Sequence, residues 1–224
     1  MLFRSTQAIK LLPVVENKQK NQIPFRKEFY RKLTHLGALV IPGGYYYFDL
    51  SRFVMLAIMI PIAIGMIFID ISRLRGWRFW NLFKPLISSM AREHEVKGDF
   101  TGAAYILTTV CLVVALFDKP VAIAALAFIM TGDSAAALIG RKFGKHKYGR
   151  KSLEGSLAFW VAAIITAYFI PDLPIKIGLI GAAVATVTEA FSLTIDDNLT
   201  VPLVSGLVMH LDRKSTRLNS SHRL

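Results

Sequence analysis

The feature that most constrains this chain is the apolar run 120–140, PVAIAALAFIMTGDSAAALIG, which contains a single charged residue, Asp133. An apolar stretch of about 20 residues is long enough to cross the hydrocarbon core of a bilayer. A lone carboxylate in such a helix costs about 2.5–3.5 kcal/mol on insertion scales, so it usually has a function or a partner. The run therefore predicts a membrane helix with one chemically useful side chain.

The rest of the chain repeats this apolar character. Hydrophobic residues make up 54% of the 224 residues, which is more than an ordinary soluble domain contains. We predict an all-α, multi-pass transmembrane helical bundle of about six or seven spans. The predicted spans are 33–50, 53–70, 100–117, 120–140, 156–171, 174–193 and 199–212. Within the first span, Pro42, Gly43 and Gly44 are expected to break the helix, and the amphipathic segment 77–92 is expected to lie among the headgroups.

The distribution of basic residues predicts the orientation of the bundle. Sixteen Lys and Arg residues lie in the gaps 26–32, 71–98 and 140–155, and three, Arg52, Lys119 and Lys176, lie in the alternate gaps. The positive-inside rule places the N-terminus and the richer gaps in the cytosol. Contact with anionic lipid headgroups and the orientation of the spans therefore explain the net charge of +12 better than binding to nucleic acid does.

Three parts are predicted along the chain: a flexible or interfacial arm over 1–25, an integral membrane catalytic domain over 26–212, and a non-native tail over 213–224. The tail is polar, lacks periodicity and resembles translated vector sequence. The single cysteine, Cys111, lies in an apolar run, so an intrachain disulfide is excluded.

Two roles are open for Asp133, one structural and one in metal binding. The small residues around it let another helix approach, so it can anchor a helix contact through a hydrogen bond. It can also bind Mg²⁺, which takes one or two carboxylates together with phosphate oxygens. Asp197 and Asn198 are further candidate metal ligands, with helix capping as their alternative. Either Asp133 or Glu189 is a candidate catalytic group that accepts a proton from a substrate hydroxyl.

The loop that follows the apolar run is cationic and rich in glycine. It is not a Walker A motif, because three residues separate Gly140 from Gly144 and His146 follows Lys145. Its backbone amides and cations still suit phosphate, as does the helix N-terminus after it. Alternatively, these basic residues set the orientation of the membrane spans or anchor the chain to lipid headgroups. The candidate nucleotide- and phosphate-binding residues are Arg31, Lys32, Gly140, Lys145, Gly149, Arg150, Lys151, Ser152 and Glu154.

Together these motifs resemble the polyprenol kinase family, which includes dolichol kinase, phytol kinase and the CTP-dependent diacylglycerol kinases. The matching stretches are Arg31-Lys32-x-x-His35, GDSAAALIGRKFGKHKYGRKSLEGS (132–156), and Glu189 followed by DNLTVPLVSG (197–206). The resemblance implies transfer of the γ-phosphate of CTP to the hydroxyl of a membrane lipid alcohol, with a divalent cation. By position it implies as site residues Asp133, Gly140, Arg150, Lys151, Glu154, Asp197, Asn198, Arg31 and Lys32.

Two other functions remain open. The same stretch resembles phosphatidate cytidylyltransferases, which make CDP-diacylglycerol, but their acidic D-R-x-D signature is absent here. A small ion-coupled transporter would use Asp133 to carry protons or cations, and it would have no need of a triphosphate cradle. The favoured prediction is a lipid kinase in the bilayer, acting at the cytosolic face on a polyprenol, phytol or diacylglycerol.

Overall fold

The computed structural model describes residues 25–87, 98–149, 151–191 and 196–221. This part of the chain is almost entirely helical, which confirms the all-α prediction, and nearly all of the predicted arm over 1–25 lies outside it. One short antiparallel hairpin joins two of the helices; its strands are β1 (Lys147–Tyr148) and β2 (Lys151–Ser152). The helices are α1 (Phe25–Gly37), α2 (Val40–Tyr47), α3 (Arg52–Leu74), α4 (Trp80–Ile87), α6 (Gly102–Leu116), α7 (Lys119–Phe143), α8 (Leu153–Phe169), α9 (Ile175–Phe191) and α10 (Asp197–Ser221).

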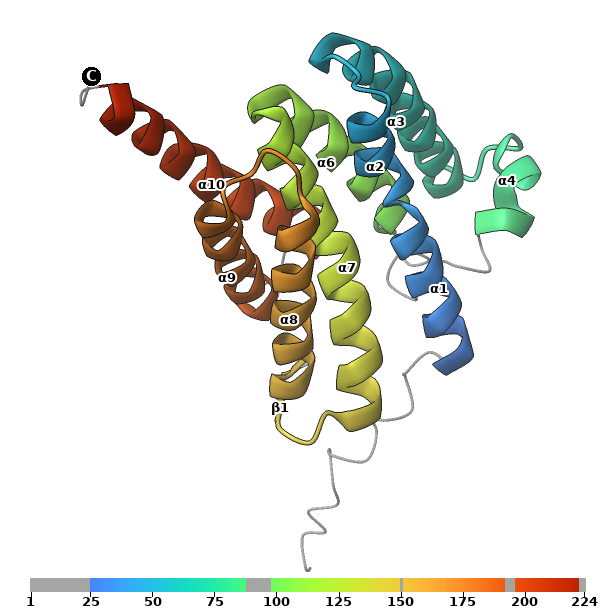
Figure 1. Ribbon diagram of the computed structural model, residues 1–224. Coiled ribbons are helices and arrows are strands. Elements are labelled where there is room, and N and C mark those ends of the chain that lie inside the picture. Colours follow the sequence, from blue (N-terminus) through green and yellow to red (C-terminus); the bar gives the residue numbers. More distant parts are fainter. Residues whose placement is uncertain (1–24, 88–97, 150, 192–195, 222–224) are drawn as a thin grey trace, which may run out of the picture.

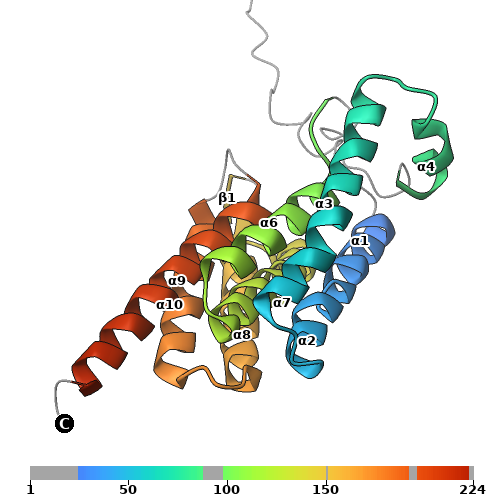
Figure 2. The same cartoon turned by 90° about the horizontal axis from the view of Figure 1, so that it is seen from above.

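Helix α7 is the centre of the bundle. Every residue from Val121 to Met130 is buried, as expected for a helix that is apolar on all sides. It contacts α1 and α2 on one side, α8 and α9 on the other, and α6 and α10 besides (Figures 1 and 2). A polar side chain in the middle of α7 therefore meets other helices rather than open solvent.

The predicted position of the break in the first span is wrong. The interruption lies at residues 38 and 39, between α1 and α2, while Pro42, Gly43 and Gly44 lie inside α2. Proline has no backbone N–H, so Pro42 cannot donate to the carbonyl four residues before it, that of Ala38. That carbonyl accepts instead from the amide of Ile41 at 2.9 Å, which tightens the chain one turn ahead of the proline.

A buried carboxylate ties the end of α3 to the start of α6. Asp70 is fully buried, and its Oδ2 accepts from both the amide and the hydroxyl of Thr101, each at 2.8 Å. Arg73 donates from Nε to its Oδ1 at 3.2 Å. Thr101 in turn caps α6, so one buried carboxylate fixes the end of α3 against the start of α6.

Two helices, α3 and α7, are long and apolar enough to cross a membrane, and α6 and α8 are shorter apolar helices. In α3 only 17% of the most apolar stretch is buried, against 61% in α7. Since a soluble protein would not leave so apolar a helix uncovered, α3 indicates a membrane protein. The full count of six or seven spans stays a prediction.

Helix α10 passes through the predicted boundary at residue 212 without a break, and its last turns extend away from the bundle in both views (Figures 1 and 2). Near that boundary, Arg213 lies 3.9 Å from a carboxylate oxygen of Asp118.

We expect the contact between α7 and α8 to be intolerant of added volume at Gly132. A Cβ atom there would lie 2.7 Å from the ring of Phe159, which is fully buried. Gly132→Ala should lower the free energy of unfolding by about 1–3 kcal/mol, because overpacking exceeds the gain in helix propensity. Gly65→Ala is the matched control, since open space surrounds Gly65 within α3; it should be neutral or stabilising by about 0.5–1 kcal/mol. Equal thermal shifts of both variants in detergent would contradict this packing.

Candidate functional site

Asp133 lies two thirds of the way along α7 and faces α1. Its Oδ2 accepts a hydrogen bond from Nζ of Lys32, which is only 3% exposed, and lies 3.6 Å from Nε2 of His35. The neighbouring Ser134 donates to the carbonyl of Met130 at 2.7 Å and so leaves this ion pair undisturbed. Asp133 therefore anchors α1 to α7. Its side chain keeps 17% of its surface exposed, which leaves access for a ligand.

A second ion-pair cluster forms where the hairpin meets α9 and α10. Lys151, on β2, donates to the backbone carbonyl of Glu189 and lies 2.8 Å from Oε1 of the same residue. Its Nζ also lies 3.0 Å from Oδ2 of Asp197. A lysine ammonium has three protons, and these three acceptors match them. Burial lowers the pKa of Lys151, but the two carboxylates outweigh it, so the pKa rises above its ordinary value.

The two clusters share one electrostatic environment. Burial raises the pKa of Asp197 to about 6, Lys151 opposes that rise, and the negative charges of Asp133 and Glu189 add to it. Charges affect one another in this way only when they lie close together in a medium of low polarity. Asp133 on α7 and Asp197 on α10 therefore lie within electrostatic reach of each other, and each is paired with a lysine; the two ion-pair clusters are together called the acidic centre.

Asn198 supplies the feature of this centre that most suggests a missing ligand. Helix capping, the alternative for Asp197 and Asn198, is carried out by Asp196: its Oδ1 accepts from the backbone amide of Asn198 at 2.9 Å and from its side-chain amide at 2.7 Å. The side-chain oxygen, Oδ1 of Asn198, is buried and has no hydrogen-bond partner. A buried oxygen without a partner costs about 1–3 kcal/mol, and an oxygen-seeking cation or a donor group would recover that cost.

The predicted glycine loop is in part a β-hairpin, which the sequence analysis did not anticipate. Gly149 stands at its turn with φ +62°, a backbone conformation that favours glycine. Arg150 lies outside the described residues, and Lys145 is exposed. Glu154 holds the base of the hairpin: its Oε1 accepts from the backbone amide of His146 at 3.2 Å and lies 2.8 Å from Nδ1 of that ring.

Two other predicted phosphate ligands have packing roles in this structure. Gly140 lies against α8: a Cβ atom there would lie 3.0 Å from Oγ of Ser152 and 3.3 Å from Cα of Gly155. Ser152 caps α8 by accepting from the amide of Gly155 at 3.1 Å. These contacts set the distance between α7 and α8 and thereby the place of the hairpin.

The structure brings five of the predicted residues into two ion-pair clusters, Lys32 with Asp133 and Lys151 with Glu189 and Asp197, and Asn198 follows Asp197 in the chain. Arg31 is paired outside these clusters, since its guanidinium lies 2.5 Å from Oε1 of Glu28. The other carboxylate oxygen of Glu28 lies 3.8 Å from the guanidinium of Arg141. The sequence analysis missed Glu28, Tyr148 and Ser156. The ion pair of Glu28 with Arg31 could have been predicted, because residues three apart on one helix lie side by side.

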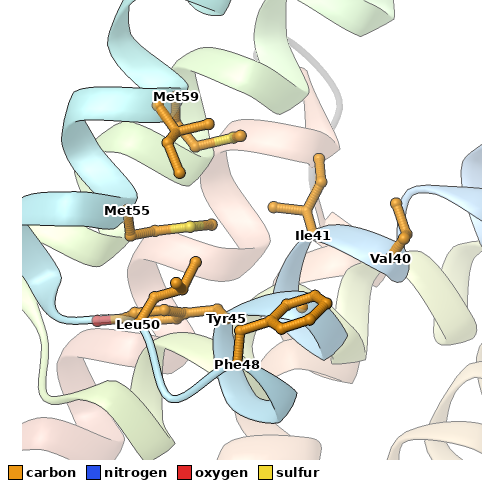
Figure 3. A pocket seen from close by; sticks show the side chains of 9 residues that line it. Val40, Ile41, Tyr45, Phe48, Leu50, Met55 and Met59 are labelled. Atoms are coloured by element: carbon orange, nitrogen blue, oxygen red, sulfur yellow. The ribbon is translucent and has the colours of Figure 1, made fainter.

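The opposite end of the bundle holds a different set of groups. Lys119 lies 2.6 Å from Asp49, and Arg52 donates to the carbonyl of Phe117 at 2.9 Å. Near this end a cavity of about 200 Å³ opens between α2 and α3 (Figure 3). Its lining is almost wholly apolar and includes Ile41 and Met59, so it has no groups that would bind a nucleotide.

Within the described residues, no three His, Cys, Asp or Glu side chains form a ready-made metal centre. Mg²⁺ does not require one, because it is usually held by one or two carboxylates and by substrate phosphates and water. The carboxylates of Asp133 and Asp197 and the unpartnered oxygen of Asn198 fit that donor set. The centre thus combines oxygen ligands for a hard cation with two lysines for a polyanion, at one end of an apolar helical bundle.

The comparisons with known proteins agree with this class of site. The chain is 28% identical to CTP-dependent diacylglycerol kinase 1 of Eremothecium gossypii, over 89% of this chain and 73% of that protein. It is 26% identical to CTP-dependent diacylglycerol kinase 1 of Schizosaccharomyces pombe, over 86% of this chain and 94% of that protein. It is 31% identical to a probable chloroplastic phytol kinase of Triticum aestivum, over 57% of this chain and 49% of that protein.

No family model matches the chain, and no solved structure matches it significantly. The named relatives confirm the resemblance to the polyprenol kinase family that the motifs suggested, and they indicate that the chain is a lipid kinase.

The pairing of Lys32 with Asp133 predicts strong energetic coupling between α1 and α7. Lys32→Met and Asp133→Asn should each lower the free energy of unfolding by about 3–5 kcal/mol, because each leaves one buried charge without its partner. The double variant should lose less than either single variant, since it removes both charges. Chemical denaturation of all four proteins in detergent measures this cycle, and strictly additive losses would show that the pair is not coupled.

Proposed function

We propose that this protein transfers the γ-phosphate of CTP to the hydroxyl group of a membrane lipid alcohol. The observation that carries the proposal is the presence of two ion pairs, Lys32–Asp133 and Lys151–Asp197, together with the unpartnered Oδ1 of Asn198, the residue that follows Asp197. Phosphoryl transfer needs little covalent chemistry from the protein and depends on positioning and charge stabilisation. CTP as the donor rests on the names of the fungal relatives.

The two lysines are neutralised by carboxylates in the absence of substrate. When the triphosphate binds, Lys32 and Lys151 turn from Asp133 and Asp197 toward phosphate oxygens. The carboxylates and Asn198 Oδ1 would then hold a divalent cation, which would offset the charge of the phosphates. Because an uncompensated buried charge costs several kcal/mol, the nucleotide and the cation are expected to bind together rather than singly.

The lipid alcohol reaches this centre from the bilayer. Asp133 lies on an apolar helix ten residues before its end at Phe143, near the level expected for a lipid hydroxyl at the membrane surface. The basic residues of the neighbouring hairpin place that surface in the cytosol by the positive-inside rule. A bundle of six or seven spans and a cytosolic active site complete the proposal.

Diacylglycerol is the first substrate to test. The alignments with the diacylglycerol kinases of two fungi cover 86–89% of this chain, whereas the alignment with the wheat phytol kinase covers 57%. Phytol and a polyprenol belong in the same panel, since the polar centre contacts the hydroxyl end that all three alcohols share.

The decisive assay offers the purified protein CTP labelled either at the γ- or at the α-phosphate, with Mg²⁺ and the lipid panel in mixed micelles. The γ-label should enter the lipid, and the α-label should stay in the aqueous phase as CDP. Asp133→Asn should lower turnover by at least about 100-fold, the effect of removing one preorganised electrostatic group. Lys142→Ala is the matched control, because Lys142 is an exposed lysine at the end of α7 whose contact is the ring of Phe143.

Two results would overturn the proposal. With phosphatidate added to the panel, entry of the α-label into lipid as CDP-diacylglycerol, with release of pyrophosphate, would identify a cytidylyltransferase. Absence of any labelled lipid, together with cation flux in proteoliposomes that is lost in Asp133→Asn, would identify a transporter.

A further inference from the structure

A hydrogen-bond chain connects the hairpin to Glu189 through two residues that the proposed reaction does not use. The hydroxyl of Tyr148, on β1, is hydrogen-bonded to Oγ of Ser156, in the first turn of α8. Ser156 donates to Oε2 of Glu189 on α9, with 3.3 Å between the oxygens. Three elements that are separate in the sequence thus meet at one carboxylate.

The direction of this chain follows from the number of protons available. A serine hydroxyl has one proton, and an ionised carboxylate can only accept, so Ser156 donates its proton to Glu189. The hydroxyl of Tyr148 must then be the donor to Ser156. The order Tyr148 to Ser156 to Glu189 leaves each hydroxyl proton with one acceptor.

Both carboxylate oxygens of Glu189 are engaged, one by Ser156 of α8 and the other by Lys151 of the hairpin. Its Oε2 accepts from Ser156, while its Oε1 and its backbone carbonyl both contact the ammonium of Lys151 on β2. Its side chain is 6% exposed. A carboxylate with both oxygens occupied and so little exposure is poorly placed to take a proton from a lipid hydroxyl.

We propose that Glu189 is a positioning residue, and that Tyr148, Ser156 and Glu189 together fix the hairpin so that Lys151 faces the phosphates of the nucleotide. One strand is held directly through Lys151, and the other is held through Tyr148 and Ser156. The inference rests on the proposed kinase function for its kinetic consequences. It replaces the sequence-based prediction of a catalytic role for Glu189, and it adds two residues, Tyr148 and Ser156, to the phosphate-binding machinery.

The kinetic test compares KM for CTP with KM for the lipid alcohol. Tyr148→Phe and Ser156→Ala should each raise KM for CTP about tenfold, the effect of losing one hydrogen bond within a charged network. KM for the lipid should stay unchanged, and the double variant should behave as either single variant does, because both break the same chain. Tyr168→Phe is the matched control, since Tyr168 is an exposed tyrosine on the same helix as Ser156.

Glu189→Gln separates positioning from base catalysis. A positioning residue predicts a raised KM for CTP with kcat and its pH profile retained. Loss of kcat by more than about 100-fold at unchanged KM for CTP, with loss of the acidic limb of the pH–rate profile, would make Glu189 the base and overturn the inference.

Amide hydrogen exchange tests the network without any reaction. In Ser156→Ala the amides of the paired strand residues Tyr148 and Lys151 should exchange about tenfold faster than in wild type, while those in the middle of α7 should not change. Unchanged exchange in the hairpin would overturn the inference even if the protein is a kinase. If the wild type phosphorylates no lipid, the proposed function fails, and this experiment still decides whether Ser156 and Glu189 hold the hairpin.

Discussion

The cost of burying charge in an apolar bundle is the constraint on which the rest of this structure depends. A charge removed from water is tolerated when an opposite charge or a set of hydrogen bonds compensates it. Asp133 is matched by Lys32, Asp70 by Arg73 and Thr101, and Glu189 by Lys151. The contacts Asp133–Lys32, Asp70–Thr101 and Glu189–Lys151 each join elements that are distant in the sequence, so these buried carboxylates set the arrangement of the bundle as well as its chemistry.

Under the proposed function, both lysines of the site are paired with carboxylates before the substrate arrives. Lysines that pair with carboxylates can exchange those partners for phosphate oxygens if a cation takes the carboxylates at the same time. The unpartnered oxygen of Asn198 is the part of the centre that remains unsatisfied in the protein alone. The short hairpin contributes stiffness, because a lysine held at a fixed place loses less freedom when it binds phosphate than one on a mobile loop.

Local patterns in the sequence predicted the helical fold. The isolated acid in the run 120–140 and the pair Asp197-Asn198 are polar residues against an apolar background; the structure brings Asp133 within electrostatic reach of Asp197, and their role as a site stays a prediction. The partner of Asp133 was not predictable, because Lys32 is 101 positions away and a charge near a membrane is equally well explained by topology. Gly140 and Ser152 make packing and capping contacts in the structure, and their binding of phosphate stays a prediction: close helix packing and phosphate binding both select small residues, and one sequence cannot distinguish them.

The most direct test of the central claim is to count bound Mn²⁺, used in place of Mg²⁺, by electron paramagnetic resonance with the purified protein and CTP. The account predicts one tightly bound ion that requires CTP, and predicts that both Asp133→Asn and Asn198→Ala abolish it, although the two residues lie on different helices. Tight Mn²⁺ binding that is retained in both variants would show that these side chains do not form a common cation site, and would contradict the account.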